Sequence, residues 1–423
     1  MARNRVIYQS EALWCAKLDE HSDGSLTADK QLLRVQDISH GVELNRTDVN
    51  EFGKLAAIDR QIIEPPTVNL DFSYYIHGGR NESLLGFDFN GTNKQGTDTS
   101  NLTNSDATGM NQAIGAFMTS TDSGRNFYIS VAKEGEDAHD KSGSDLAGVI
   151  GIGNGYITNY SVEAAVGDMP TASVSVEANN IRFNASGTQI PNPAIDLNTG
   201  ETFNTVKISN FPAADHTGDS GSSSAGYEAI CVKPGDITVD FNDAGWGLPA
   251  TDSTDSQAVE GLGGAALEGK GQMHLQNFTL DIPMARTALN RLGNRYPYYR
   301  AVDLPLNLTF SCSAFLADIA DGNLNDLICS SATDRNIRVR FMSSCAKEDG
   351  SNSSTVVQEY LLKKCTLESQ NFSNSIGDNK TVDLVFNCQV GGASSTNEGL
   401  FMTKKRALTQ DDVDASVNPR DAS

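Results

Sequence analysis

The sequence predicts a mainly β protein with two tandem antiparallel β-sandwich or β-barrel domains, each with one short helix. Three observations favour this fold class. Several runs alternate apolar and polar residues, as half-buried strands do. Residues that favour turns, such as Gly, Ser, Asn and Asp, are abundant between these runs. A long segment also recurs, and 423 residues are enough for two domains that each bury a core.

The recurring segment is residues 35–76, which aligns without gaps with residues 275–316. "RTDVNEFG", which begins at Arg46, meets "RTALNRLG", which begins at Arg286. Further identical residues stand at matched positions in the two copies: Arg60 and Arg300, Gly53 and Gly293, and Pro65 and Pro305. This self-similarity indicates duplication of one domain.

Three later blocks recur in the same order: 126–131 with 336–341, 159–164 with 364–369, and 167–176 with 377–386. The first and third pairs are 210 residues apart and the middle pair 205, whereas the opening segments are 240 apart. The difference indicates an insert in the first copy. We assign it to the polar loop at about residues 86–113, because insertions in exposed loops cost little stability.

The expected domains are residues 1–180 and 181–403, followed by a C-terminal arm or flexible tail at 404–423. Each domain should contain, in order, an opening strand, a second strand, a third alternating strand, a short helix and a closing hairpin. In the first domain these are residues 5–18, 26–44, 67–76, 80–87, and 155–166 with 170–178. In the second they are residues 227–241, 270–282, 306–316, 321–330, and 358–369 with 380–390.

The matched glycines and prolines have expected backbone roles. Gly53 and Gly293 should end a helical turn or take a positive φ. Pro65 and Pro305 should open a strand where no ladder donor is required. "RTDVNEFG" itself is predicted to be a turn between two strands, with Arg46 in a contact between domains.

Charge and cysteine content exclude several classes of protein. The formal net charge is −22, which argues against a nucleic-acid binder with a basic footprint. No segment approaches the roughly 20 apolar residues that span a bilayer, and the N-terminus does not resemble a secretory signal. The seven cysteines are odd in number and form no CxxC pair, so we expect thiols in a reducing compartment rather than disulfides or a zinc site.

Motifs that suggest an enzyme lack the context that their chemistry needs. "GDSGS" (218–222) lies in a loop-like run, and no histidine has a recognisable partner motif for a catalytic triad. "GAALEGKG" (264–271) has Gly271 where a phosphate-binding loop needs Ser or Thr. "GIGNGY" (151–156) is interpreted as a turn into a strand, and "DIADGNLND" (318–326) lacks calcium-loop spacing. We expect no catalytic, cofactor-binding or metal site, and no enzyme.

Two stretches carry a family resemblance. "NRLGNRYPYYRAVDLPLNLTF" (290–310) and "YSVEAAVGDMPTASVSVEANN" (160–180) resemble the tail-tube, or major tail, proteins of long-tailed bacteriophages. The first copy departs from the pattern at "KLAAIDR" (54–60), where the second has "NRYPYYR". The resemblance implies two packed antiparallel sheets flanked by a helix. It also implies that six domains close into a ring around a β-barrel, and that rings stack into a tube that conducts DNA.

A duplicated tail-tube-like domain needs only three chains for a six-domain ring, so we expect a homotrimer with pseudo-six-fold symmetry. Ring closure would remove exposed sheet edges, and an acidic lumen would let DNA pass without binding. The resemblance further implies a place in the virion tail after synthesis in the host cytoplasm. Its partners there would be other tail proteins, namely the terminator, hub and tape measure, with no membrane and no cofactor.

Other interpretations stay open. A tail hub or distal-tail protein would use the same paired domains in a single ring. A β-sandwich that binds a receptor or glycan would need an aromatic patch, whereas the chain has only Trp14 and Trp246. At the matched sites, Arg46, Arg60, Arg286 and Arg300 either form an assembly interface between domains or rings, or are surface charges of little weight. The substitution Arg286→Glu is expected to impair assembly while the monomer stays folded.

Overall fold

The computed structural model describes the greater part of the chain. The described residues are 10–18, 26–89, 112–119, 124–197, 202–203, 206–213, 232–241, 273–316, 335–342, 356–374, 379–393, 395 and 398–404. Several sequence-based expectations lie outside them: most of the insert, the second helix, the motifs at 218–222, 264–271 and 318–326, and the tail beyond residue 404.

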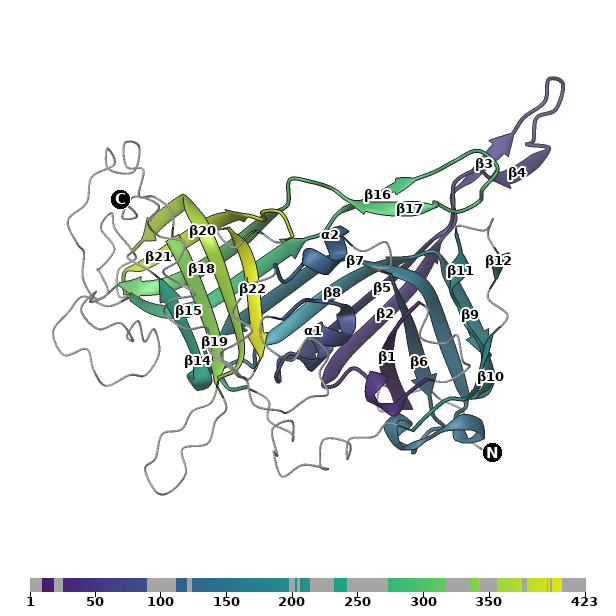
Figure 1. Ribbon diagram of the computed structural model, residues 1–423. Coiled ribbons are helices and arrows are strands. Elements are labelled where there is room, and N and C mark those ends of the chain that lie inside the picture. Colours follow the sequence, from purple (N-terminus) through teal and green to yellow (C-terminus); the bar gives the residue numbers. More distant parts are fainter. Residues whose placement is uncertain are drawn as a thin grey trace.

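One 14-stranded antiparallel sheet dominates the structure (Figure 1). The main path runs β14-β19-β20-β21-β18-β15-β7-β8-β5-β2, and β1, β6, β9 and β22 are attached to it. The mainly β fold class is therefore confirmed. In the described residues, four two-stranded sheets accompany this one, and two of them are the hairpins β3–β4 and β16–β17.

The elements divide into two groups along the chain, which we call strand sets. The first strand set (residues 10–213) contains β1 (Glu11–Lys17), β2 (Val35–Glu43), β3 (Arg46–Val49), β4 (Asp59–Ile62), β5 (Thr67–Tyr75), β6 (Arg125–Val131), β7 (Gly148–Ala165), β8 (Thr171–Ala178), β9 (Asn180–Asn184), β10 (Thr188–Pro191), β11 (Ile195–Asp196), β12 (Thr202–Phe203) and β13 (Lys207–Asn210). It also contains α1 (Arg80–Leu85) and α2 (Gly115–Thr119), and short 3-10 turns at 28–30, 138–140 and 143–145.

The second strand set (residues 232–404) contains β14 (Ile237–Phe241), β15 (Met273–Pro283), β16 (Arg286–Leu289), β17 (Tyr299–Val302), β18 (Asn307–Leu316), β19 (Arg335–Met342), β20 (Val356–Ser373), β21 (Thr381–Gln389) and β22 (Gly399–Lys404). A 3-10 turn precedes β14 at residues 234–236.

Alternation in the sequence explains the central strands. In β5, the side chains of Val68, Leu70, Phe72 and Tyr74 are buried, and the intervening residues are half-buried or exposed. Period-two burial of this kind places one face of a strand in the core. The expected helix at 80–87 is confirmed as α1, and the expected hairpins are confirmed as β7–β8 and β20–β21.

The same order of strand pairing occurs in both strand sets. The first set pairs in the order β2-β5-β8-β7-β6-β1, and the second in the order β15-β18-β21-β20-β19-β14. β9 adds to β7 as β22 adds to β20. Bulges between Val35 and Asp37 and between Leu275 and Asn277 occupy matched positions. Rare positive φ angles also match, at Asn154 and Lys364.

The sheet register corrects one of the sequence matches. Glu163 of β7 lies opposite Thr171, and Ser373 of β20 lies opposite Thr381. Residues 159–164 therefore correspond to 369–374, at the same offset of 210 as the neighbouring blocks, and the match with 364–369 was wrong. The wrong match is displaced by five residues, and in a regular strand an odd shift exchanges the buried and exposed faces. The bulge between Leu367 and Ser369 changes the phase of the pattern, which is why the wrong match also aligned apolar residues.

The run "GIGNGY" is also corrected, because it lies inside β7 and is not a turn. A Cβ atom on Gly153 would lie 2.1 Å from the carbonyl oxygen of Pro193. The glycine therefore lets the backbone around Pro193 approach the strand closely.

Residues after the expected domain boundary at 180 pack with the strands before it. β9 pairs with β7 through residues 180–184. A separate apolar cluster places Ile190, Ile208 and Phe211 against Trp14 and Tyr128. The first strand set therefore extends to residue 213.

Among the described residues, no helix is long and apolar enough to cross a membrane. The four cysteines in this part of the chain are buried, and none of them forms a disulfide: Cys15, Cys312, Cys365 and Cys388.

Candidate assembly interface

The two strand sets meet through a strand pair that we call the internal junction. β15 pairs antiparallel with the second half of β7, from Asn277 opposite Ala165 to Pro283 opposite Asn159. The pairing is extended at its two ends, where Met284 N donates to Thr158 O at 2.8 Å and Val166 N donates to Gln276 O at 2.9 Å. Backbone groups at this edge of each strand set are thus satisfied by the other set.

The internal junction also buries apolar side chains. On β15 and just after it, Phe278, Leu280, Ile282 and Met284 are at most 3% exposed. On β7, Tyr160 and Val162 are fully buried. The sheet therefore continues across the junction with a shared core.

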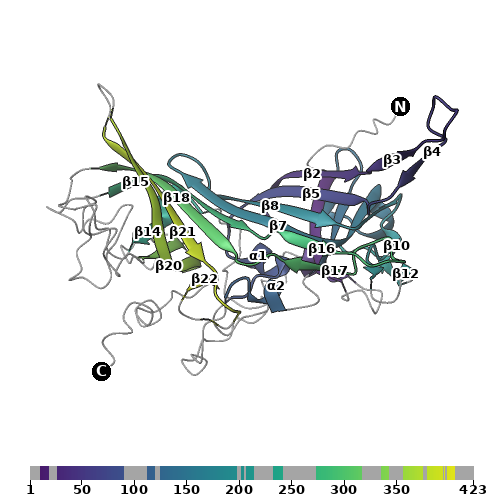
Figure 2. The same ribbon diagram turned by 90° about the horizontal axis from the view of Figure 1, so that it is seen from above.

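The hairpin β16–β17 lies over the first strand set, beside α2 and β7 (Figures 1 and 2). Arg286 Nε donates to the carbonyl oxygen of Ile157 at 3.3 Å. Its guanidinium carbon is 5.2 Å from the centre of the Tyr156 ring and 5.9 Å from that of Phe117, which are cation–π distances. Burial lowers the pKa of Arg286 to about 10, so the side chain stays charged at neutral pH.

Arg300 fixes the other strand of this hairpin. Its Nη1 donates to Glu177 Oε2 at 2.6 Å, and its Nη2 donates to Asn179 Oδ1 at 3.1 Å. The Arg300 residue is 5% exposed, whereas the Glu177 side chain is 43% exposed. Charge-assisted hydrogen bonds of this length are among the stronger polar contacts in proteins. Arg286 and Arg300 thus bind the second strand set to the first within one chain, so Arg286→Glu is expected to disturb the fold of the single chain as well as any assembly.

The matched hairpin β3–β4 has a different environment. It projects from the body of the molecule beyond the end of β2 (Figures 1 and 2). Arg46 is exposed. Arg60 has a side chain that is 68% exposed, and its ion pair in the described residues is local, from its Nε to Asp48 Oδ1 at 2.8 Å. The register of the two hairpins is identical, since Arg46 pairs with Ile62 as Arg286 pairs with Val302.

The turns and prolines of the two hairpins follow the sequence-based expectation in part. Gly53 and Gly293 have φ of 89° and 92°, which confirms the expected positive φ. The stretch "RTDVNEFG" is half strand and half turn, because β3 takes its first four residues. Pro65 and Pro305 each lie two residues before a strand, β5 and β18.

Matched positions differ in exposure at the two outer edges. On β2 and just after it, Val42 is 45% and Leu44 47% exposed, whereas their counterparts Ile282 and Met284 are 0% and 1% exposed. On β20, Phe372 is 47% exposed, whereas its counterpart Val162 is fully buried. The internal junction buries these positions, whereas at the outer edges they stay about half exposed, with Lys380 Nζ 5.1 Å from the centre of the Phe372 ring.

These two outer edges lack strand partners in the described part of the chain. β2 pairs only with β5, and residues 366–373 of β20 pair only with β21. Their counterparts, β15 and the second half of β7, pair with each other. We call the outer edges of β2 and β20 the free edges.

A buried hydroxyl network, which the sequence reasoning missed, also joins the strand sets. Glu82 of α1 accepts hydrogen bonds from Tyr74 and Tyr160, each at 3.0 Å. The Tyr160 hydroxyl lies 2.9 Å from that of Tyr360 in β20. Burial raises the pKa of all three tyrosines, so they stay neutral. The only signal in the sequence is a tyrosine at a core-facing position of each strand.

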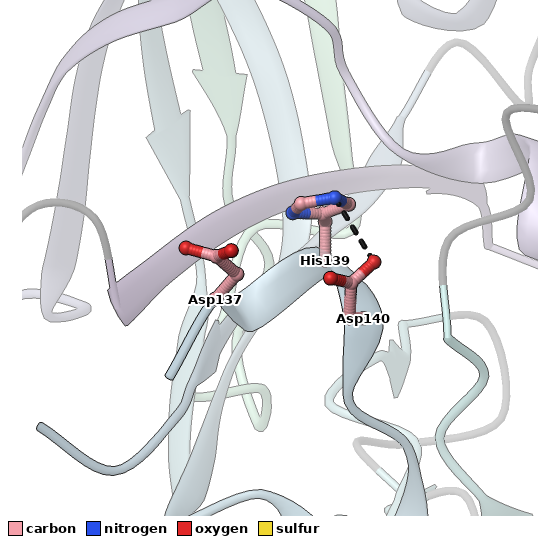
Figure 3. A group of neighbouring side chains, drawn as sticks. All are labelled: Asp137, His139 and Asp140. Carbon is pink, nitrogen blue, oxygen red and sulfur yellow. Dashed lines mark ion pairs between the residues drawn. The ribbon is translucent and has the colours of Figure 1, made fainter. Parts of the chain in front are cut away.

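A possible metal-ligand group occurs on the 3-10 turn at 138–140. Asp137, His139 and Asp140 place one ligand atom each within 4.8 Å of one another, and His139 Nε2 lies 3.0 Å from Asp140 Oδ1 (Figure 3). Both carboxylates are exposed, and exposed acidic groups commonly occur without a metal. The group is a surface feature beside β1.

In the described residues, the chain is an antiparallel β structure with one internal junction between its strand sets. Its two free edges correspond to the two strand edges that form this junction. No protein-family model matches the chain, and its sequence matches no curated protein.

Proposed function

We propose that the chain is a structural protein of a bacteriophage virion, the tail-tube subunit that the sequence resemblance implies. One observation carries the proposal. The internal junction joins two copies of one strand pattern through β15 and the second half of β7, and the corresponding edges of β2 and β20 have no strand partner in the described residues. A surface of this kind is suited to repeated association with further copies of the same chain.

In this proposal the two strand sets are tandem units, residues 10–213 and 232–404, that arose by duplication. The recurring strand order, register, bulges and positive φ angles support duplication, because unrelated folds do not share all four. Each unit is a β-sandwich-like body, and α1 is the short helix of the first unit.

Association of the free edge of β2 with that of β20 is heterologous, so it generates a closed ring or an open helix. Six units in a ring correspond to three chains, which is the pseudo-six-fold homotrimer expected for a duplicated tail-tube domain. Stacked rings would form a hollow conduit for DNA ejection. A net charge of −22 would keep DNA phosphates from binding to the wall.

The proposed role is not enzymatic and requires no cofactor. The partners would be further copies of this chain, the other tail proteins, and DNA that passes through without specific binding. The site of action would be the virion tail.

Negative-stain electron microscopy and native mass spectrometry of the purified protein test this function. Hollow tubes built from rings of three chains are the expected result. Single rings that never stack would favour a tail hub or distal-tail protein with the same paired units. A chain that stays monomeric at every concentration would overturn the proposal.

A further inference from the structure

We infer that the free edge of β2 in one copy pairs antiparallel with residues 369–373 of β20 in the next copy, with Ser39 opposite Ser373. The inference rests on the proposed assembly and specifies its contact. The register comes from the internal junction, where Thr279 lies opposite Glu163. Ser39 matches Thr279, and Ser373 matches Glu163, through the pairing of β2 with β5 and of β20 with β21.

The occupant is a second copy of this chain because the exposed groups match those that the internal junction buries. In the inferred register His40 lies opposite Phe372, and Val42 lies opposite Gln370. Phe372 and Val42 are among the exposed large apolar side chains. Gln370 Nε2 is a buried polar atom with no hydrogen-bond partner in the described residues. Strand addition would cover both kinds of group.

The projecting hairpin β3–β4 would then lie over β20 and β21 of the neighbour, as β16–β17 lies over β7 and β8. Arg60 takes the place of Arg300, and Asn387 stands where the internal junction has Glu177. Asn387 Nδ2 donates to Glu368 Oε1 at 2.9 Å, which keeps a carboxylate at this position. Asn387 Oδ1 has no partner in the described residues. Arg60 is therefore assigned to Glu368 and Asn387 of the next copy.

Paired cysteines test the register. Paired residues in adjacent antiparallel strands have Cα atoms about 4.5–5.5 Å apart, within disulfide range. Within one chain, six strands separate β20 from β2 on the sheet path, roughly 30 Å at normal strand spacing, so any Ser39–Ser373 disulfide joins two copies. The test variant is Ser39→Cys with Ser373→Cys. The control is Ser39→Cys with Ser369→Cys, about 13 Å out of register.

After air oxidation with copper phenanthroline, the test variant should give cross-linked chains on non-reducing gels, at a yield at least tenfold above the control and the native chain. The covalent products should stop at three chains. Equal yields from both variants would overturn the register. Tubes in the microscope with no cross-link in the test variant would also overturn it, while leaving the proposed function intact. A protein that forms neither assemblies nor cross-links would overturn both.

A charge exchange tests the Arg60 contact. Arg60→Glu and Glu368→Arg should each raise the concentration needed for assembly at least tenfold, whereas the two changes together should restore it to within about threefold. Both side chains are exposed in the single chain, so the unfolding midpoint of the monomer should not change. Failure of the double variant to recover, with both monomers folded, would overturn the contact.

Discussion

Arg60 and Arg300 occupy matched positions in the two hairpins, and a methionine substitution should affect them very differently. Methionine keeps a long apolar stem and removes the charge. In Arg300→Met, Glu177 loses its ion pair and the buried Asn179 loses a donor. In Arg60→Met, only a contact with Asp48 between exposed side chains is lost.

The structure sets the size of the difference. Breaking a fully buried ion pair costs about 3–5 kcal/mol, because one charge is left unpaired. The Glu177 side chain is 43% exposed, so water recovers part of this cost, and about 3 kcal/mol is expected once the Asn179 hydrogen bond is included. The exposed Arg60 pair is worth less than about 1 kcal/mol.

Native-state hydrogen exchange on the monomer measures this loss of stability at the hairpin β16–β17 itself. In Arg300→Met, amides of residues 286–303 should exchange about a hundredfold faster, which corresponds to about 3 kcal/mol less protection. In Arg60→Met, amides of residues 46–62 should change by less than about fivefold. Unchanged protection of 286–303 in Arg300→Met, or equal effects in the two variants, would refute the assignment of Arg300 to the internal junction.

Three further outcomes follow from buried groups. Burial lowers the pKa of His77 to about 4, so the stability linked to its neutral form is present above pH 6.5 and is lost as the pH falls toward 4. The free energy of unfolding, measured with urea, should therefore fall by about 2 kcal/mol between pH 7 and pH 5, and His77→Gln should remove that loss. Tyr360→Phe leaves the hydroxyl of Tyr160 without this partner and should cost about 1–2 kcal/mol in the same assay, with no change in the secondary structure by circular dichroism. Gly153→Ala forces a Cβ to 2.1 Å from a backbone oxygen and should lower the melting temperature by several degrees, whereas Gly235→Ala, with nothing within 4 Å, should not.

Sequence periodicity was sufficient for the strands that bury one face. β5 and β8 alternate strictly, and matched turns at Gly53 and Gly293 fixed one register over a long segment. Periodicity failed for β20 because the bulge between Leu367 and Ser369 changes the phase of the period-two pattern, so only the pairing with β21 defines the register. It also failed for "GIGNGY", where Gly153 allows a close backbone approach from Pro193, 40 positions away in the sequence.

The environment of the matched arginines could not be predicted from residue type. Arg60 and Arg300 are the same residue in the same hairpin register, and one is exposed while the other is buried. The difference arises from which strand edge has a neighbour within the chain. That is a property of tertiary structure, and the residues that the two hairpins share do not reveal it.

The proposed duplication would have a consequence for assembly. In the proposed ring of three chains, three of the six contacts between units would be internal junctions that exist before association. Only the other three contacts would then cost the entropy of bringing molecules together. The internal contact holds a direct ion pair between Arg300 and Glu177, whereas the contact between chains would rely on Arg60 with Glu368 and Asn387. Arg60 must also leave Asp48, which weakens the net gain. Raised salt should therefore release intact folded chains before it disturbs the internal junction, and sedimentation with hydrogen exchange on one sample would show the order. Loss of protection in residues 286–303 before release of chains would contradict this difference between the two contacts.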